Sequence, residues 1–263
     1  MFEYRENVLC CEQVPLANLA AKFGTPLYVY SASAIRERYA AFDQAFDGAP
    51  HSICYSVKAN SNLSILKLLA VLGSGFDVVS GGELQRILRS APQGAPQIVF
   101  SGVGKTAAEI DAALRADILL LNVESESELA LVARRAARLR KKARVALRIN
   151  PDVSAVTHPY ISTGQFQHKF GVPVSEARGL YRQAAREKWL EVVGISAHIG
   201  SQIMEAAPFR ALSRCLVELT RELRGDGIRI RYLDVGGGLG IPYDGPESHA
   251  PLVRRLGAYA RAI

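Results

Sequence analysis

Charged side chains follow or interrupt short apolar runs at several points of this 263-residue chain. Lys58 directly follows one such run, and an amine desolvated at that position would have a lowered pKa. A neutral lysine amine is the nucleophile that forms a Schiff base with a carbonyl compound. A single lysine more often reaches for solvent at the start of a loop. Lys58 is therefore a candidate nucleophile that needs support from its neighbours.

Further charged residues repeat this pattern. Asp77 and Arg148 each interrupt an apolar run, and a buried charge needs a partner of opposite sign. We expect Lys58 or Arg148 to pair with Asp77, and Arg148 to need a carboxylate. His198 ends another run, a position that favours a functional role over the commoner structural one. Glu83 is a further candidate, and its alternative role is that of a first-turn helix residue favoured by the helix dipole.

Three consecutive glycines, Gly236, Gly237 and Gly238, follow the last apolar run. Glycine lets backbone N–H groups approach an anion closely, and a tight turn rarely needs three of them. A phosphate site after the seventh strand is common in (β/α) barrels. A phosphate cradle together with a Schiff-base lysine indicates pyridoxal 5'-phosphate. A Schiff-base aldolase that acts on a phosphorylated sugar is the open alternative.

The sequence does not support three other kinds of site. The stretch Gly102-Val103-Gly104-Lys105-Thr106 resembles half of a nucleotide-binding P-loop, but Val99 stands where that pattern needs its first glycine. The 4 cysteines include no C-x-x-C pair, so neither a zinc ribbon nor a thioredoxin-type redox site is predicted. We expect no metal site.

Strands and helices that alternate along the chain must bring these residues together. Seven nearly continuous apolar runs predict strands covered on both faces: Ser52–Val57, Phe76–Ser80, Ile98–Ser101, Ile118–Val123, Val145–Asn150, Val192–His198 and Tyr232–Val235. Helical patterns lie between or after them: Leu63–Leu72, Ala107–Arg115, Ser125–Lys142, Val174–Glu187, Pro208–Arg224 and Leu252–Ile263.

Seven successive βα units predict an α/β fold, a (β/α)8 TIM-type barrel of which seven of the eight units are present. A doubly wound parallel sheet is the competing fold. The site of such a barrel lies at the carboxyl ends of its strands, where the candidate residues gather. We expect residues 25–263 to form this barrel, incomplete at its C-terminal end. Residues 1–24 form a separate segment with short β stretches and a short helix.

Composition and charge narrow the classes of partner. The chain is 49% hydrophobic with a formal net charge of +7. Its basic run, 134–144, has no interleaved aromatic residues, which favours a solvated helix face over a nucleic-acid site. No apolar run approaches the roughly 18 residues that a bilayer needs, and the charged N-terminus does not resemble a signal peptide. We expect a cytoplasmic protein without nucleic-acid or membrane partners.

Several segments together carry a resemblance to a known family: Tyr55–Asn60, Phe76–Leu84, His168–Gly171, His198–Gln202 and Gly236–Ile241. In this set the chain resembles the fold-type III pyridoxal-phosphate decarboxylases. Asn150–Asp152 with Thr157–Gly164 is similar to the diaminopimelate decarboxylases of that fold. The similarity runs in the family's order from about Gly24 to Tyr243.

The resemblance implies roles for individual residues. Lys58 matches the lysine that binds the cofactor through a Schiff base, and His198 matches the histidine stacked on the cofactor ring. Ser201 and Gly236–Gly238 match phosphate-binding positions. Asp77, Glu83 and Arg148 match charged positions that organise lysine and histidine around the cofactor. His168 stands where asparagine is more usual in the family.

The resemblance further implies a carboxy-lyase that converts meso-diaminopimelate to L-lysine in lysine biosynthesis, as a homodimer with a small amino-acid substrate. The family continues with an eighth strand and a β domain that carries active-site residues, and with which residues 1–24 would pack. We therefore expect the 263-residue chain itself to be inactive. The alternatives are a decarboxylase for another amino acid or a polyamine precursor, a non-catalytic cofactor-binding barrel, and a regulatory paralogue.

Overall fold

The structure is a computed structural model that describes residues 1–91, 97–151, 170–243 and 251–263. Its main sheet consists of parallel strands in the spatial order β11 (Tyr232–Asp234), β10 (Leu190–Ala197), β8 (Ala143–Asn150), β7 (Leu120–Val123), β6 (Ile98–Phe100), β5 (Gly75–Val78) and β4 (Cys54–Ser56). The short β9 (Val172–Pro173) pairs with the end of β8. Each strand of the main path overlaps a predicted run.

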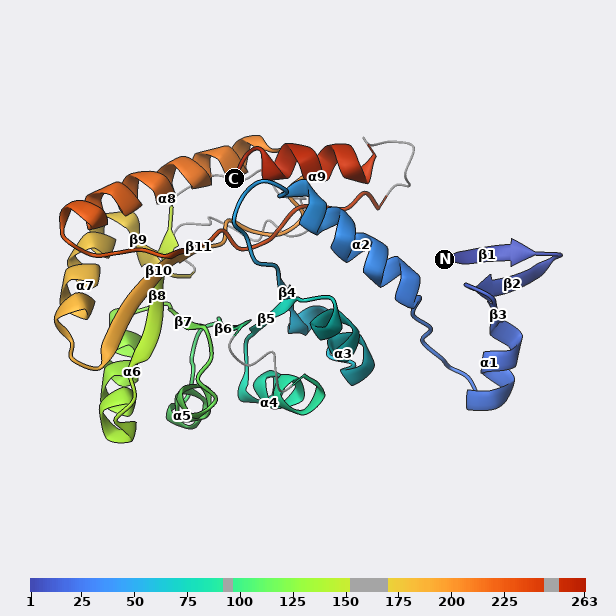
Figure 1. Cartoon of the computed structure of the whole chain (residues 1–263), viewed down its shortest axis with the longest axis horizontal. Helices are drawn as coiled ribbons and strands as arrows, with labels where there is room; N and C mark the ends of the chain where they lie inside the picture. Colours follow the sequence, from blue (N-terminus) through green and yellow to red (C-terminus); the bar gives the residue numbers. More distant parts are fainter. Residues whose placement is uncertain (92–96, 152–169, 244–250) are drawn as a thin grey trace.

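Strand order follows chain order without a reversal, which confirms the barrel-type α/β fold over the doubly wound sheet. In Figure 1 the strands lie inside a curved row of helices. Within the described residues β4 and β11 are the two edges of the sheet. The sheet is therefore a curled, open array of seven βα units, as predicted.

Most helices of the array follow the strands as predicted. They are α3 (Leu63–Val71), α5 (Ala107–Arg115), α6 (Glu126–Leu139), α7 (Val174–Arg186), α8 (Ala207–Gly225) and α9 (Leu252–Ala260). The helix α4 (Gly81–Ser90), which follows β5, was not predicted. A 3₁₀ turn, η1 (Val57–Ala59), directly follows β4. No helix in the described ranges is long and apolar enough to cross a membrane.

The helix α2 (Ala32–Ala45) was not predicted either. It begins after Ser31, whose Oγ accepts a hydrogen bond from the amide of Ala34 at 3.1 Å. It packs beside α9, where Phe42 lies 5.9 Å from the ring of Tyr259, centroid to centroid. Ile35, Tyr39 and Phe42 stand at helical spacing in it, a signal that the sequence interpretation did not use.

Residues 1–24 form a small unit that stands apart from the main sheet in Figure 1. It contains β1 (Phe2–Arg5), β2 (Val8–Cys11), β3 (Val14–Pro15) and α1 (Leu16–Phe23), with the strands paired in that order. Cys10 and Cys11 are buried in it as free thiols. A carboxylate joins the unit to the rest of the chain, because Glu12 accepts hydrogen bonds from Ser31 Oγ and the amide of Ser33.

The two faces of the main sheet are different. Alternate side chains of a strand point to opposite faces, so Leu121 and Val123 of β7 join the large core beneath the helices. The inner face of the curl carries a smaller apolar layer that includes Cys54, Val99, Leu120 and Ala146. Two residues farther along the same strands, the inner face turns polar, with Ser56, Ser101, Asn122 and Arg148. This polar layer lies toward the carboxyl ends of the strands, where the site was predicted.

Candidate cofactor site

Asp77 of β5 lies in the polar layer of the inner face. Its Oδ1 accepts a hydrogen bond from Ser101 Oγ at 2.5 Å, and its Oδ2 accepts one from Ser56 Oγ at 3.2 Å. Burial raises the pKa of Asp77, while the bond from Ser101 opposes that rise. The predicted ion pair with Lys58 or Arg148 is wrong: Asp77 binds the hydroxyl groups of Ser56 and Ser101, and Arg148 pairs with Glu124.

Asp234, at the end of β11, is the second carboxylate of this layer. Asn122 Nδ2 donates to Asp234 Oδ2 at 2.6 Å and to Ser101 Oγ at 3.0 Å. Ser196 Oγ also donates to Asp234 Oδ2, at 3.1 Å. Hydrogen bonds therefore connect Asp77 with Asp234 through the inside of the curl.

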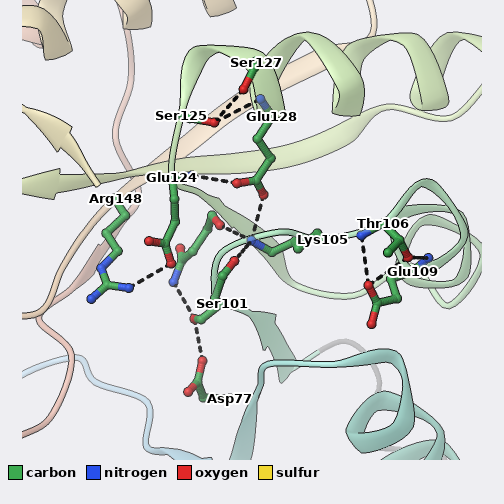
Figure 2. A network of polar contacts seen from close by, with 12 residues as sticks. Asp77, Ser101, Lys105, Thr106, Glu109, Glu124, Ser125, Ser127, Glu128 and Arg148 are labelled. Carbon is green, nitrogen blue, oxygen red and sulfur yellow. Dashed lines mark hydrogen bonds and ion pairs between the residues drawn. The ribbon is translucent and has the colours of Figure 1, made fainter. Parts of the chain in front are cut away.

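Arg148 of β8 has the carboxylate partner that the sequence required. Its Nη1 lies 2.8 Å from Glu124 Oε1, and both side chains are largely buried (Figure 2). Glu124 follows β7, the strand next to β8, so two neighbouring strand ends hold the pair. The guanidinium also lies 5.3 Å from the ring centroid of Phe170.

Lys58 lies in η1 at the carboxyl end of β4, as predicted, but its side chain is exposed. The expectation of a desolvated amine is wrong for this structure, because Lys58 is exposed after β4, which is an edge strand within the described residues. Lys58 nevertheless lies close enough for its charge to act on the ionisation of both Asp77 and His198. The amine is thus reachable from solvent and faces the polar layer.

His198, just past the end of β10, is neutral near pH 7. Burial, together with the positive charges of Arg148 and Lys58, lowers the pKa of His198 to about 4, while the charge of Asp234 opposes the shift. Its Nδ1 is buried and has no hydrogen-bond partner among the described residues. A neutral imidazole with an unused ring nitrogen is thus held between two cations and a carboxylate.

The glycines after β11 pack against His198 and the loop that follows it. A Cβ at Gly236 would lie 2.7 Å from His198 Nδ1, and one at Gly238 would lie 2.0 Å from the carbonyl oxygen of Gly200. Both glycines have positive φ, +68° and +103°. Gly237 differs, because a Cβ there would meet no atom within 4 Å. Packing explains the outer two glycines and leaves open space above the middle one.

Ser201 and Glu83 are less closely tied to this group. Ser201 is exposed in the loop after β10. Glu83 Oε2 accepts a hydrogen bond from the amide of Val79 at 2.9 Å, and its own amide donates to Ser80 Oγ at 3.2 Å. Glu83 therefore stabilises the start of α4, which is the alternative role that its position suggested. Its role toward a cofactor remains a prediction.

The stretch that resembles a P-loop has a structural role. The side chain of Lys105 is 1% exposed. Its Nζ donates to Glu128 Oε1 at 2.8 Å and to the carbonyl oxygens of Gly102 and Asn122 at 2.7 and 2.6 Å (Figure 2). All three protons of the ammonium group are thus used within the protein, which agrees with the exclusion of a nucleotide site.

Some predicted motifs lie outside the described residues. They are Asp152, Thr157–Gly164, and His168 with Lys169. Within the described part, no group of three or more His, Cys, Asp or Glu side chains could hold a metal ion.

The sequence interpretation missed the polar layer itself. Ser56, Ser101, Asn122, Glu124 and Asp234 belong to it, and none was a candidate. The available signal was a polar residue two positions after an apolar one at the end of several strands, all on one face. The predicted barrel made that signal readable, because its strands surround a common interior, but the sequence interpretation did not use it.

Comparisons with known proteins agree with this geometry. Residues 32–263 match the family model described as pyridoxal-dependent decarboxylase, pyridoxal binding domain. Diaminopimelate decarboxylase of Pseudomonas aeruginosa is 48% identical over 262 residues, which are 100% of this chain and 62% of that protein. The Vibrio cholerae enzyme of the same name is 53% identical over 244 residues, 92% of this chain and 58% of that one.

Solved structures give the same result. Diaminopimelate decarboxylase from M. jannaschii, solved with L-lysine, shares 39% identity and a TM-score of 0.89, and the match covers 100% of this chain and 62% of that chain. SrLDC, solved with PLP and cadaverine, shares 27% identity and a TM-score of 0.80 over 100% of this chain and 61% of that one.

The chain spans 58% to 62% of the length of these relatives. The family match covers most of the chain, including every strand of the curled sheet and the residues around Lys58 and His198. The chain therefore belongs to the pyridoxal-dependent decarboxylases, as their pyridoxal binding domain.

Proposed function

We propose that this chain binds pyridoxal 5'-phosphate at the carboxyl ends of its strands, with Lys58 as the attachment point. The whole protein then decarboxylates meso-diaminopimelate to L-lysine. The observation that carries the proposal is the grouping of Lys58, Asp77 and His198 beside the glycine loop, Gly236–Gly238. The similarity to several diaminopimelate decarboxylases supports the choice of substrate.

The residues present fit this cofactor. Within the described residues the amides of Gly237 and Gly238 donate to no protein group, so both can bind a phosphate, and the space above Gly237 leaves room for it. Ser201 is exposed on the neighbouring loop and can add a hydroxyl. His198 supplies a neutral imidazole for contact with an aromatic ring. The glycine loop and His198 are packed together, so phosphate and ring would be held by one rigid unit.

When bound, pyridoxal phosphate supplies the electron sink that stabilises the carbanion left by loss of CO₂. The chain's own residues prepare the site for it. Lys58 presents its amine from an exposed turn, where it would hold the aldehyde of the cofactor. Glu124 fixes Arg148, whose charge helps to keep His198 neutral. Glu83 fixes the start of α4 beside β5.

Borohydride reduction with the cofactor present, followed by peptide mass mapping, tests the attachment point. We expect a pyridoxyl adduct on Lys58 and on no other lysine. Lys105 is an internal control, because it also follows a strand but its ammonium group is buried and fully bonded. Lys58→Ala should abolish the adduct, whereas Lys67→Ala, at an exposed position of α3, should retain it. An adduct on another lysine of the wild-type chain would refute the assignment.

Measuring CO₂ release from a panel of amino acids tests the substrate. We expect the full-length protein to act on meso-diaminopimelate in preference to L-lysine, L-ornithine and L-arginine. Preference for one of the latter would instead favour the polyamine-related alternative, for which the similarity to SrLDC is the supporting observation.

We infer a cytoplasmic homodimer in which residues 1–24 pack against a further domain. The N-terminal unit exposes Phe2, Tyr4 and Phe23, which supports such a contact. We also infer that residues 1–263 alone have little activity, because the site is open between edges β4 and β11. Turnover by this segment equal to that of the longer protein would contradict this.

A further inference from the structure

The glycine loop is anchored to the inside of the sheet by Asp234. The amide of Gly236 donates to Asp234 Oδ1 at 2.9 Å, which fixes the first residue of the loop in its positive-φ conformation. Gly236 also lies against His198, with room for no side chain between them. A shift of the Asp234 carboxylate would therefore move the loop relative to the imidazole.

Asp234 is held in turn by Asn122 from the far side of the curl. Asn122 is 1% exposed, and its Nδ2 donates to Asp234 Oδ2 at 2.6 Å. Asn122 belongs to β7 and Asp234 to β11, which are separated in the sheet by β8 and β10. The contact therefore crosses the interior and is independent of the strand ladder.

The chemistry of the network requires an amide at position 122. Ser101 Oγ donates its proton to Asp77 and accepts one from Asn122, and Asp234 only accepts. Asn122 thus donates one proton directly to Asp234 and the other to Ser101, which in turn donates to Asp77. A carboxylate at this position would face Asp234 with no proton between them, and an apolar side chain would leave Asp234 without its shortest bond.

We infer that Asn122 is a positioning residue that acts through Asp234 on the glycine loop, and so sets the affinity of the site for a phosphate group. The inference rests on the proposed function, because the phosphate is that of pyridoxal phosphate. Asn122 lies in the polar layer, and the hydrogen bonds of its amide go to Ser101 and Asp234 rather than to the glycine loop.

Affinities for two ligands separate this role from a merely structural one. Dissociation constants of pyridoxal phosphate and of pyridoxal, which lacks the phosphate, are measured by absorbance and fluorescence titration of the full-length protein. We expect Asn122→Ala to weaken binding of pyridoxal phosphate at least tenfold and to change that of pyridoxal less than twofold. Inorganic phosphate should also bind the Asn122→Ala variant more weakly than the wild type, as measured by its competition with pyridoxal phosphate.

Leu120→Ala is the matched control. Leu120 lies two residues earlier on β7, on the same inner face and equally buried, but it belongs to the apolar layer. It should lower the melting temperature and leave the ratio of the two affinities unchanged. Asn122→Asp, which keeps the shape of the side chain, replaces Asn122→Ala if thermal melting shows that the alanine variant is unfolded.

A double variant tests the pathway through Asp234. In Asn122→Asp with Asp234→Asn, the amide at 234 donates to 122 while its carbonyl still accepts from Gly236. The restoration is partial, because residue 122 no longer donates to Ser101 Oγ. We expect each single variant to lose the phosphate preference and the pair to regain at least threefold of it.

Two negative results have different meanings. A wild-type protein that binds neither ligand would overturn the proposed function. A wild-type protein with a clear phosphate preference that the Asn122 variants retain would overturn only the role of Asn122.

Discussion

At the scale of single residues, the protonation state of His198 is the most direct consequence of the site's electrostatics. With a pKa of about 4, its ring should stay neutral from pH 8 to about 5. A histidine NMR titration measures this. His51 is the internal control, because its bonds to the carbonyl of Ala49 and to Asp43 raise its pKa above the usual value. Titration of His198 near pH 6.5 would contradict the burial described for it.

The same shift makes stability depend on pH in a defined direction. Between about pH 4 and 6.5 the unfolded state binds more protons at residue 198 than the folded state does. The free energy of unfolding should therefore fall as the pH falls through this window. The raised pKa of Asp77 has the opposite effect. Between pH 3.8 and that raised pKa, it makes the free energy of unfolding rise as the pH falls. His198→Gln should flatten the slope between pH 4 and 6.5 in urea denaturation, whereas an unchanged slope would show that other groups cause it.

Lys105 provides a prediction about stability. Lys105→Met should lower the free energy of unfolding by about 3 kcal/mol, because Glu128 would remain buried without its cation. Lys67→Met, at an exposed position, should change it by less than about 0.5 kcal/mol. Urea denaturation compares the two variants. A small effect at Lys105 would mean that the ammonium group is not committed to structure.

At the scale of elements, three consecutive helices begin in the same way. α4, α5 and α6 each start after a serine or threonine that caps a glutamate amide three residues later, at Glu83, Glu109 and Glu128. The side chains of Glu83 and Glu128 then accept a backbone N–H just after the preceding strand, and that of Glu109 accepts one at the start of the preceding helix, α4. These repeated pairs of hydrogen bonds fix the loops at the strand ends around the site.

Tyr181 of α7 joins two strands where their pairing is irregular. The register between β8 and β10 shifts at Val192 and Gly194, and the hydroxyl of Tyr181 donates to the carbonyl of Gly194 at 2.9 Å while accepting from the amide of Leu147 at 3.2 Å. Tyr181→Phe should therefore cost about 1–3 kcal/mol, because two buried backbone groups lose their partner.

Tyr28→Phe is the control for this variant, because Tyr28 is 85% exposed. Urea denaturation measures both variants, and the free energy of unfolding of Tyr28→Phe should equal that of the wild type. Equal stability of the Tyr181→Phe variant would mean that water replaces the hydroxyl at the bulge.

The elements that the sequence predicted are those whose signal is local. The strands appear as apolar runs because both faces are covered. Asp77 and Arg148 stand out within these runs, and Lys58 and His198 stand out at their ends. The hydrogen bond between Asn122 and Asp234 could not be predicted, because β7 and β11 are not neighbours in the sheet and these residues meet only across the inside of the curl. The exposure of Lys58 likewise depends on what covers β4, which no local pattern reports.

At the scale of the whole molecule, protection of the sheet should follow strand position. β8 and β10 have neighbours on both sides and helices outside, whereas β11 exposes Tyr232 and Leu233. Local opening requires less free energy where fewer contacts are lost.

Hydrogen exchange followed by mass spectrometry can rank the strands of residues 1–263. We expect peptides from β8 and β10 to exchange most slowly and those from β4 and β11 at least tenfold faster, with β1 and β2 exchanging as a separate unit. The comparison between β10 and β11 is the most informative, because Ile195 and Leu233 are register partners and differ mainly in having a further strand beyond them. Equal protection of these partners would mean that another segment covers β11, and the open edge described here would then be wrong.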